Sequence, residues 1–356
     1  MRMRFFHWRG KSLWLGFALL LLAAPLVFAQ SAALSILSQC GCMMILALSF
    51  NMLLGQSGML SFGHAVYSGL AAFASVHLMN RLAGSSPALL LLVPLAGGLA
   101  GMLAGAVFGY ITTRRSGTAL SMISLALVEL TAAAALMLPD WFGGESGVST
   151  DRVLGAPLAG VDFASQLQVY YLIAFWLAIC TAAMYGLTRT PLGRIANAVR
   201  DNPQRAAFIG HDARRVRYLM FILSAFFAGI GGALMAINFE IASAENLSLL
   251  RSAQILLFTF IGGIGYFFGP LAGALVGVLF SSLLSAYTRG WQLYLGLLFV
   301  LIVLFAPGGI AGAWISLLGG WRRMTAGVWL RLAGGLLMAC GAVFLIEMLY
   351  RRAATL

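Results

Sequence analysis

Long apolar runs recur along most of this chain, and they limit its possible folds more than any other feature. A helix that crosses a bilayer needs about 20 predominantly apolar residues. Runs that meet or approach this length cover residues 12–29, 32–54, 62–79, 88–111, 118–138, 168–187, 217–238, 252–267, 268–287, 291–307 and 326–349. Because 61% of the residues are hydrophobic and only 9% are charged, the sequence predicts an all-α polytopic membrane protein rather than soluble domains. Glycines and Pro270 near residue 265 either break a helix or form a tight turn there.

The first 30 residues have two interpretations. Basic residues precede the apolar run from Ser12 to Ala29, and Val27-Phe28-Ala29 resembles the cleavage site of a secretory signal. Many further spans follow, however, and the apolar run is long for a signal core. We therefore expect residues 1–30 to form a basic segment and a retained first transmembrane helix.

Basic residues predict which side of the membrane each loop occupies, because lysine and arginine concentrate in cytoplasmic loops. If the spans alternate, one side receives the N-terminus, Arg114-Arg115, residues 188–216 and Arg322-Arg323. We assign this side to the cytoplasm and the acidic loop 139–167 to the outside. Arg351-Arg352 then lies outside, against the rule, so either the last segment does not span or an earlier span is wrong. The same bias explains the net charge of +12, and nucleic acid is not an expected partner.

Two segments carry small-residue ladders, in which glycines share one face of a helix and let another backbone approach closely. The glycines recur every four residues, at Gly97, Gly101, Gly105 and Gly109 and again at Gly269, Gly273 and Gly277. Tight packing within a bundle is sufficient to explain both ladders, and neither indicates a substrate.

No pattern of catalytic, metal-ligating or cofactor-binding residues is found. The cysteines all lie in apolar segments, without the spacing of a redox or zinc motif, and we expect them to be small buried hydrophobes; they are Cys40, Cys42, Cys180 and Cys340. A Walker A loop needs G-x-x-x-x-G-K-[ST], but the only lysine is Lys11, and Phe5 stands where the first glycine belongs. The chain is therefore expected not to be an enzyme, and its energy must come from another chain or from an ion gradient.

The highest density of charge is in residues 189–217, which hold seven arginines. Pro191 and Pro203 each suit the first turn of a helix, with Thr190 and Asn202 as N-caps and Gly210 as a C-terminal glycine. The pattern predicts two short helices with apolar faces and no core of their own. Three interpretations remain open: contact with anionic lipid headgroups, packing on the cytoplasmic ends of the chain's own helices, or docking of a cytosolic protein.

A polar, uncharged stretch, GQSGMLSFGH, interrupts the apolar runs after residue 54. It carries Gln56, Ser57, Ser61 and His64. One interpretation is a cytoplasmic hairpin. The other is a discontinuous helix whose freed backbone groups line a translocation path. His64 alone is more often a satisfied polar residue than a ligand contact.

Glu129 lies near the middle of the predicted span 118–138. A carboxylate at that depth is costly, and it usually faces a bundle interior or a watery path. An interhelical hydrogen bond is the simpler alternative. Because a proton-coupled transporter would also use such a residue, Glu129 does not by itself distinguish between mechanisms.

Three stretches resemble one family in matching order: LALSFNMLLGQSGMLSFGHAVYSGLAAFAS (46–75), GRIANAVRDNPQRAAFIGHDARRVRYLMFILSAFFAGIGGALMA (193–236) and IGGIGYFFGPLAGALVG (261–277). They are similar to the LivM-type membrane permeases of ABC importers for branched-chain amino acids. The resemblance covers most of residues 30–312, so we expect a permease core at 31–312. Residues 313–356 depart from the pattern and form an appendage with a probable extra span at 326–349.

The resemblance implies a type II importer permease with about ten helices in the inner membrane and its N-terminus in the cytoplasm. It also implies a second, homologous permease chain, two cytosolic ATPase subunits that dock on the 188–216 loop, a periplasmic solute-binding protein and contact with membrane lipid. The expected coupling residues are Gly193, Arg194, Asp201, Arg205, Ala206, Ala207 and Gly210. Arg200, Arg214 and Arg215 could be headgroup contacts only.

The implied solute is a branched-chain amino acid or a related small polar solute, such as another amino acid, urea or an amide. An ion-coupled secondary transporter or channel is the alternative; it predicts inverted repeats and more intramembrane charge than the spans contain. A membrane-embedded enzyme would need converging His, Asp or Lys residues, which the spans lack. A structural subunit without a transport path is only weakly opposed by the arginine-rich loop.

Overall fold

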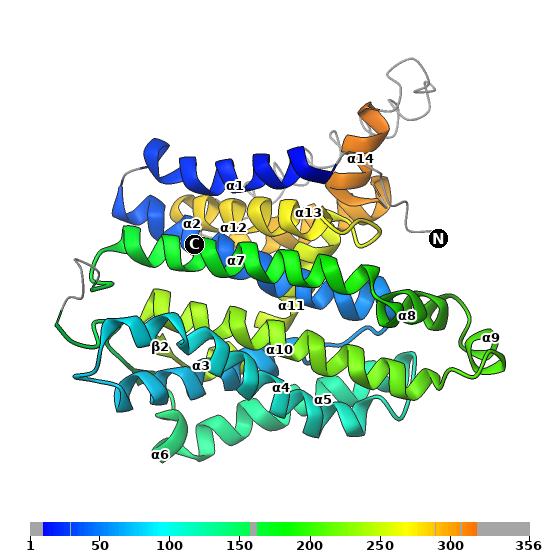
Figure 1. Ribbon diagram of the computed structural model, residues 1–356, viewed down its shortest axis with the longest axis horizontal. Helices are drawn as coiled ribbons and strands as arrows, with labels where there is room; N and C mark the ends of the chain where they lie inside the picture. The colour runs from blue at the N-terminus through cyan, green and yellow to red at the C-terminus, as the bar shows by residue number, and fades with distance from the viewer. Residues whose placement is uncertain (1–9, 29, 157–161, 289, 307, 319–356) are drawn as a thin grey trace, which may run out of the picture. The chain divides into compact units, whose positions relative to one another are not determined.

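The computed structural model describes residues 10–28, 30–156, 162–288, 290–306 and 308–318, and most of them are helical (Figure 1). The chain divides into two compact units, one from Phe5 to Leu256 and one formed mainly by Leu257–Leu356. Each unit is described separately below.

The first unit contains the helices and strands that run from α1 to the start of α11. Their bounds are α1 (Gly10–Val27), α2 (Ser31–Asn51), the π-helix η1 (Met52–Gln56), α3 (His64–Arg81), the 3-10 helix η2 (Pro87–Leu91), α4 (Val93–Thr112), α5 (Thr118–Met137), α6 (Pro139–Phe142), β1 (Val148–Ser149), α7 (Gln166–Arg189), α8 (Pro191–Asp201), α9 (Pro203–Phe208), α10 (Ala213–Phe239), β2 (Ile241–Ala242), the 3-10 helix η3 (Ala244–Leu247) and α11 (Leu249–Gly262). The second unit contains α12 (Gly269–Tyr287), α13 (Trp291–Phe305) and α14 (Gly309–Leu318).

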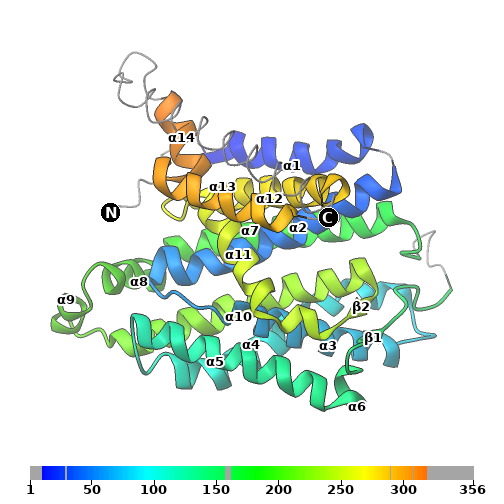
Figure 2. The same cartoon turned by 180° about the vertical axis from the view of Figure 1, so that it is seen from behind.

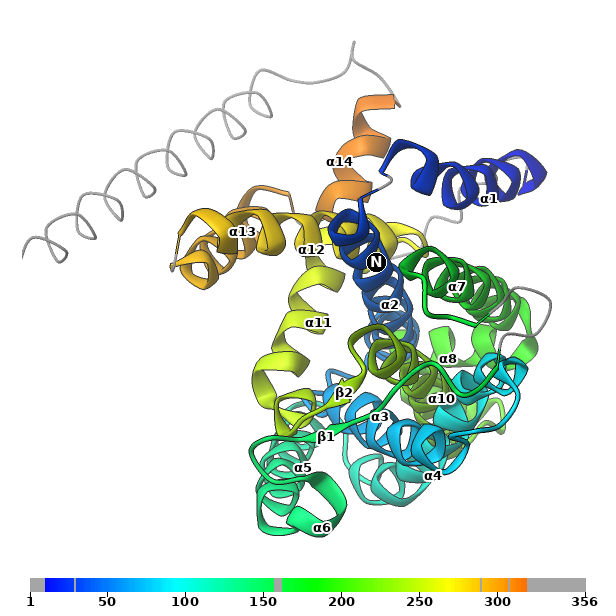
Figure 3. The same cartoon turned by 90° about the vertical axis from the view of Figure 1, so that its left-hand side faces the viewer.

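Helix α10 is the centre of the first unit, where it packs against α2, α3 and α4 (Figure 3). Small residues allow this close approach on more than one side. A Cβ on Gly231 would lie 2.9 Å from the Leu46 side chain, and one on Gly232 would collide with the Ser68 carbonyl of α3. The sequence GIGGALMA therefore forms a helix that is buried all round.

The glycine ladder of α4 faces α10, as the sequence predicts. A Cβ on Gly97 would lie 2.5 Å from Ala233 Cβ, and one on Gly101 would lie 2.5 Å from the Ala225 carbonyl oxygen. The opposite face of α4 carries exposed apolar side chains with the same four-residue spacing: Leu95, Leu99, Leu103, Val107 and Ile111. The glycine face of α4 therefore packs against α10, and the opposite apolar face is free to contact lipid or another chain.

The second unit resolves the ambiguity near residue 265. The helical structure is interrupted between the end of α11 at Gly262 and the start of α12 at Gly269, and Gly263 takes a φ of +105°. The ladder of α12 packs on the chain just before the break, since a Cβ on Gly273 would lie 2.6 Å from Gly262 Cα. The two predicted segments, 252–267 and 268–287, are thus separate helices.

Several helices are long and apolar enough to cross a membrane by length and composition. Six qualify within the described residues: Ser31–Gln56, Pro87–Thr112, Thr118–Met137, Gln166–Arg189, Ala213–Phe239 and Gly269–Ala286. Three shorter apolar helices, Gly16–Val27, Leu249–Gly262 and Trp291–Leu304, coincide with further predicted spans. Helix α3 falls at the predicted span 62–79 but does not qualify. The total of about ten spans stays a prediction, and 326–349 lies outside the described residues.

The two ends of α10 lie at opposite ends of the first unit (Figures 1 and 2). Helices α8 and α9 precede its N-terminus. Beyond its C-terminus, β2 pairs with β1 in an antiparallel ladder, Val148 with Ala242 and Ser149 with Ile241. This ladder is a small departure from the all-α prediction.

Three contacts fix residues 139–152 of the predicted outside loop. His77 Nε2 lies 2.7 Å from the Trp141 carbonyl oxygen, and Asn80 Nδ2 donates to the Ser149 carbonyl at 3.1 Å. The Arg152 guanidinium pairs with Glu240 Oε1 at 3.4 Å, where Glu240 ends α10 in a left-handed conformation with a φ of +56°. The described part of the predicted outside loop up to Arg152 is therefore held to the ends of α3 and α10.

Candidate coupling and solute-binding sites

The arginine-rich loop folds as two capped helices, in agreement with the sequence. Thr190 Oγ1 accepts from the Gly193 N–H at 3.3 Å, and Asn202 Oδ1 accepts from the Arg205 N–H at 3.0 Å. Each capping residue is followed by a proline in the first turn of the helix. Proline has no backbone N–H, but N–H groups in the first turn have no acceptor within the helix, so no hydrogen bond is lost. Gly210 follows α9 with a φ of +89°. Local capping chemistry thus builds this element without a core of its own.

Burial separates the predicted coupling residues into two groups. Gly193 and Ala206 are buried: α8 packs against α7 and α10, and a Cβ on Gly193 would lie 2.9 Å from Thr188 Cα. These two residues shape the loop and do not reach its surface. The remaining predicted residues are exposed: Arg194, Asp201, Arg205, Ala207 and Gly210.

Two large apolar side chains project from the tip of the loop. Phe208 is 90% exposed and Ile209 is 76% exposed. Both lie where the sequence predicts the second short helix with its apolar face, and neither is among the expected coupling residues. The signal was present, because adjacent large apolar residues exposed on a charged loop are typical of an interaction surface.

Arg200 connects this loop to the polar segment after α2. Its guanidinium donates to the Gly55 carbonyl within η1, and it pairs with the Asp201 carboxylate at 2.9 Å. Its stem lies against Gly58, where a Cβ would be 2.7 Å from Arg200 Cγ. Gly58 has a φ of +67°, which suits a glycine. The interpretation of Arg200 as a headgroup contact only is therefore wrong.

The polar segment 55–64 is a break between helices. The α-helix α2 gives way to the π-helix η1, and α3 begins only at His64. Hydroxyl groups of α5 hold the chain in between: Ser124 Oγ accepts from the Phe62 N–H at 2.9 Å, and Ser121 Oγ donates to the Leu60 carbonyl at 2.7 Å. Irregular backbone buried in protein in this way is the form expected of a discontinuous helix.

The four polar residues of this segment, Gln56, Ser57, Ser61 and His64, are all buried. His64 Nε2 lies 2.8 Å from Ser49 Oγ, whose own hydroxyl donates to the Leu46 carbonyl at 2.7 Å. The imidazole therefore donates to the serine. In this conformation the segment contacts protein, and its place on a translocation path stays a prediction.

Glu129 lies apart from these residues. It is exposed on the outward face of α5, together with Met122, Leu130 and Met137, whereas Ser121 and Ser124 lie on the buried face. Among the described residues, Glu129 has no hydrogen bond or ion pair. The expected interhelical hydrogen bond is therefore not formed within the described part of the chain.

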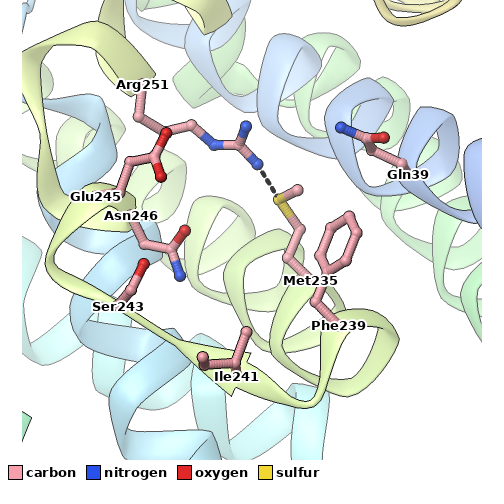
Figure 4. Close-up of a pocket in the computed structure, with 8 residues that line it drawn as sticks. All are labelled: Gln39, Met235, Phe239, Ile241, Ser243, Glu245, Asn246 and Arg251. Atoms are coloured by element: carbon pink, nitrogen blue, oxygen red, sulfur yellow. Dashed lines mark hydrogen bonds between the residues drawn. The ribbon is translucent and has the colours of Figure 1, made fainter. Parts of the chain in front are cut away.

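A cavity at the other end of α10 was not predicted. Its volume is about 240 Å³, and its lining comes from α2, the end of α10, the segment around η3 and the first turn of α11 (Figure 4). The lining residues are Gln39, Met235, Phe239, Ile241, Ser243, Glu245, Asn246 and Arg251. No sequence motif marks this set, because its members are brought together only by packing.

Comparison with known proteins identifies the family. A family model described as "Branched-chain amino acid transport system / permease component" matches residues 32–307. The chain belongs to this permease family. It is 27% identical over 289 residues to the high-affinity branched-chain amino acid transport system permease protein LivM of Escherichia coli, covering 75% of this chain and 67% of that protein. No solved structure matches.

Relatives with the name LivH match more weakly. The permease is 22% identical over 286 residues to LivH of Salmonella typhimurium, covering 75% of this chain and 90% of that protein. It is also 24% identical over 288 residues to a probable LivH of Methanocaldococcus jannaschii, covering 76% and 88%.

Family membership and the apolar helices make this permease a multi-pass inner-membrane protein. The matched residues include the arginine-rich loop, the discontinuous segment and the cavity. The family's activity is transport, so a catalytic centre is not needed to explain the polar residues within the helices.

Proposed function

We propose that this permease is a transmembrane subunit of an ABC importer for branched-chain amino acids. In this proposal, separate ATPase subunits dock on α8 and α9, which lie in the cytoplasm with the N-terminus. The observation that carries the proposal is the exposure of Phe208 and Ile209 at the tip of a structured loop. Lipid headgroups need only positive charge, whereas a groove on a partner protein needs apolar anchors at a fixed position. The solute class comes from the relatives' names.

The contact between Arg200 and Gly55 supports a route for coupling. An ATPase that moves α8 would pull on η1 through this hydrogen bond and through the packing of Arg200 on Gly58. Segment 55–64 separates α2 from α3, so a shift there would change how these helices meet. Such a linkage converts ATPase closure into a change between inward-facing and outward-facing states, provided the ATPase contacts the two states differently.

Partners follow from the same proposal. Relatives named LivM and LivH both match the chain, which supports a second, homologous permease beside it. The exposed apolar faces of α4 and α5 are available for that chain and for lipid. A solute-binding protein would approach the opposite end, where residues 139–156 and the β1–β2 ladder lie.

The ion-coupled alternative rests on one observation, the unpaired and exposed Glu129 on α5. In an ABC importer this carboxylate would instead face the second permease or the solute path, where water or a partner stabilises it. The two functions differ in their partners and in their energy source.

The experiment is affinity purification of the tagged permease from its host in mild detergent, with Phe208→Asp as the test variant. Stoichiometric ATPase subunits are expected with the unchanged chain and lost with Phe208→Asp, because the acid cannot enter an apolar groove. Phe208→Leu should retain them, as should Trp141→Asp, an equivalent change on an exposed aromatic residue of the other end. A folded chain that never co-purifies with an ATPase would reject the importer proposal.

A further inference from the structure

Arg251 lies beside the cavity of Figure 4, where the Glu245 carboxylate attracts it electrostatically but forms no direct ion pair with it. Its guanidinium donates to Gln254 Oε1 at 3.3 Å on its own helix, and to Met235 Sδ at 2.5 Å. A thioether is a weak acceptor, and a guanidinium carries five N–H donors in a planar fork. Among the described residues no carboxylate forms an ion pair with Arg251. The Arg251 guanidinium is planar, lies at a cavity and has only weak hydrogen-bond partners. It is therefore suited to bind both oxygens of a carboxylate at the same time.

Glu245 supplies the opposite charge at the same cavity. It lies in η3, six positions before Arg251, and its carboxylate forms no ion pair with any described residue. Ser243 and Asn246 stand beside it with oxygen atoms that accept hydrogen bonds (Figure 4). The cavity thus presents a cation and an anion that attract each other but are not in direct contact as an ion pair.

The rest of the lining is apolar. Met235 and Phe239 come from the last turns of α10, and Ile241 comes from β2. These side chains can bury a short aliphatic group of a ligand through the hydrophobic effect, which needs no hydrogen bond. A volume of about 240 Å³ is below the range of about 300–1,000 Å³ typical of sites for drug-sized ligands. The space therefore suits one free amino acid rather than a peptide.

We propose that this cavity binds a free α-amino acid as its zwitterion, with the carboxylate on Arg251, the ammonium group at Glu245 and the side chain against Met235, Phe239 and Ile241. This inference rests on the proposed function and deepens it, since it selects amino acids over urea, amides and simple carboxylates. A simple carboxylate can satisfy only one of the two charges, and urea or an amide carries no charge to pair with either. Each of those solutes therefore leaves at least one charge without an ionic partner.

The position of the cavity fits a site of entry. Helix α10 begins after the arginine-rich loop and ends at Phe239, so the cavity lies at the end remote from α8 and α9. If the loop faces the cytoplasm, the cavity faces the side from which solute is delivered. The polar segment 55–64 contacts α8 instead. It is therefore a location on the proposed solute path that is separate from the cavity.

The test is equilibrium binding of radiolabelled L-leucine to the purified importer complex in nanodiscs, without solute-binding protein or nucleotide. Two competitors each lack one charge: 4-methylpentanoate lacks the ammonium group, and 3-methylbutylamine lacks the carboxylate. Arg251→Gln should weaken L-leucine binding by about 10- to 100-fold, the range for a lost hydrogen bond to a charged group. It should leave binding of the amine unchanged. Glu245→Gln should weaken L-leucine and the amine, and leave the carboxylate unchanged.

Arg81→Gln is the matched control, because it removes an exposed arginine from the same end of the first unit. Its L-leucine affinity should equal that of the unchanged chain. Equal weakening of all three compounds by Arg251→Gln would overturn the proposal, since it would indicate a general structural role. Undetectable L-leucine binding by the unchanged complex, or tighter binding of phosphoethanolamine than of L-leucine, would overturn it too.

Failure of this site is distinguishable from failure of the importer proposal. If ATPase subunits co-purify but L-leucine does not bind, the importer stands and the site is wrong. If L-leucine binds with the expected pattern to a chain that has no ATPase partner, the site stands and the importer is wrong.

Discussion

Arg200 is the residue at which the candidate coupling loop and the discontinuous segment meet. Its guanidinium is bonded to the Gly55 carbonyl and its aliphatic stem lies against Gly58, so its position is fixed along its length. Such a side chain transmits displacement better than a solvated one does. The contact joins residues 145 positions apart in the chain. It makes Arg200 a positioning residue, since it touches neither ATP nor solute.

We expect Arg200→Ala to separate ATP hydrolysis from transport. ATPase subunits should still co-purify, because Phe208 and Ile209 are unchanged, and solute-stimulated uptake should fall by about tenfold or more, as for one lost hydrogen bond to a charged group. Uptake and ATPase activity of reconstituted complexes measure the two effects. Arg215→Ala is the control, since its side chain is 86% exposed and it should behave as the unchanged chain. Loss of ATPase binding with Arg200→Ala would assign the residue to docking instead.

At the scale of elements, the glycines of α4 determine how closely α4 and α10 approach. A Cβ on Gly101 would lie 2.5 Å from the Ala225 carbonyl oxygen and 2.8 Å from Gly229 Cα. Both neighbours are backbone atoms, which cannot rotate away. Any side chain at this position must therefore push the two helices apart.

Gly101→Ala should consequently destabilise the permease by about 1–3 kcal/mol, the usual cost of overpacking. Gly186→Ala is a matched control within α7, because nothing lies within 4 Å of its added Cβ. Alanine there should be neutral or stabilise by up to about 1 kcal/mol, through helix propensity. Thermal unfolding in one detergent measures both. Equal melting temperatures for the two variants would show that α4 and α10 pack less closely than described.

Elements defined by local chemistry could be predicted from the sequence. Thr190 and Asn202 cap helices through residues three positions away, and the ladder of α4 is a periodicity within one helix. The cavity could not be predicted, because Gln39 and Arg251 come to line one cavity only after α2 packs against α10. The partner of Arg200 was missed for the same reason. Glu129 was recognised as unusual, but its direction depends on the rotation of α5, which a uniformly apolar helix does not specify.

At the scale of the whole molecule, the remaining question is which energy source drives transport. The described helices contain few ionisable groups for a proton relay, and Glu129 forms no ion pair or hydrogen bond among the described residues. A relay needs successive groups within hydrogen-bond reach, so a lone carboxylate does not support one. An external ATPase explains why the charged residues gather in one loop instead of along a path through the membrane.

We therefore expect uptake of a branched-chain amino acid by vesicles that contain the assembled complex to require internal ATP and to stop with vanadate. Collapse of the proton gradient by an uncoupler should leave the initial rate unchanged when ATP is supplied directly, because no step would move a proton with the solute. Vesicles with Phe208→Asp should show no uptake under either condition, as the ATPase would be absent. Uptake that persists in Phe208→Asp vesicles and disappears with the uncoupler would assign transport to an ion gradient, with Glu129 as its proton carrier.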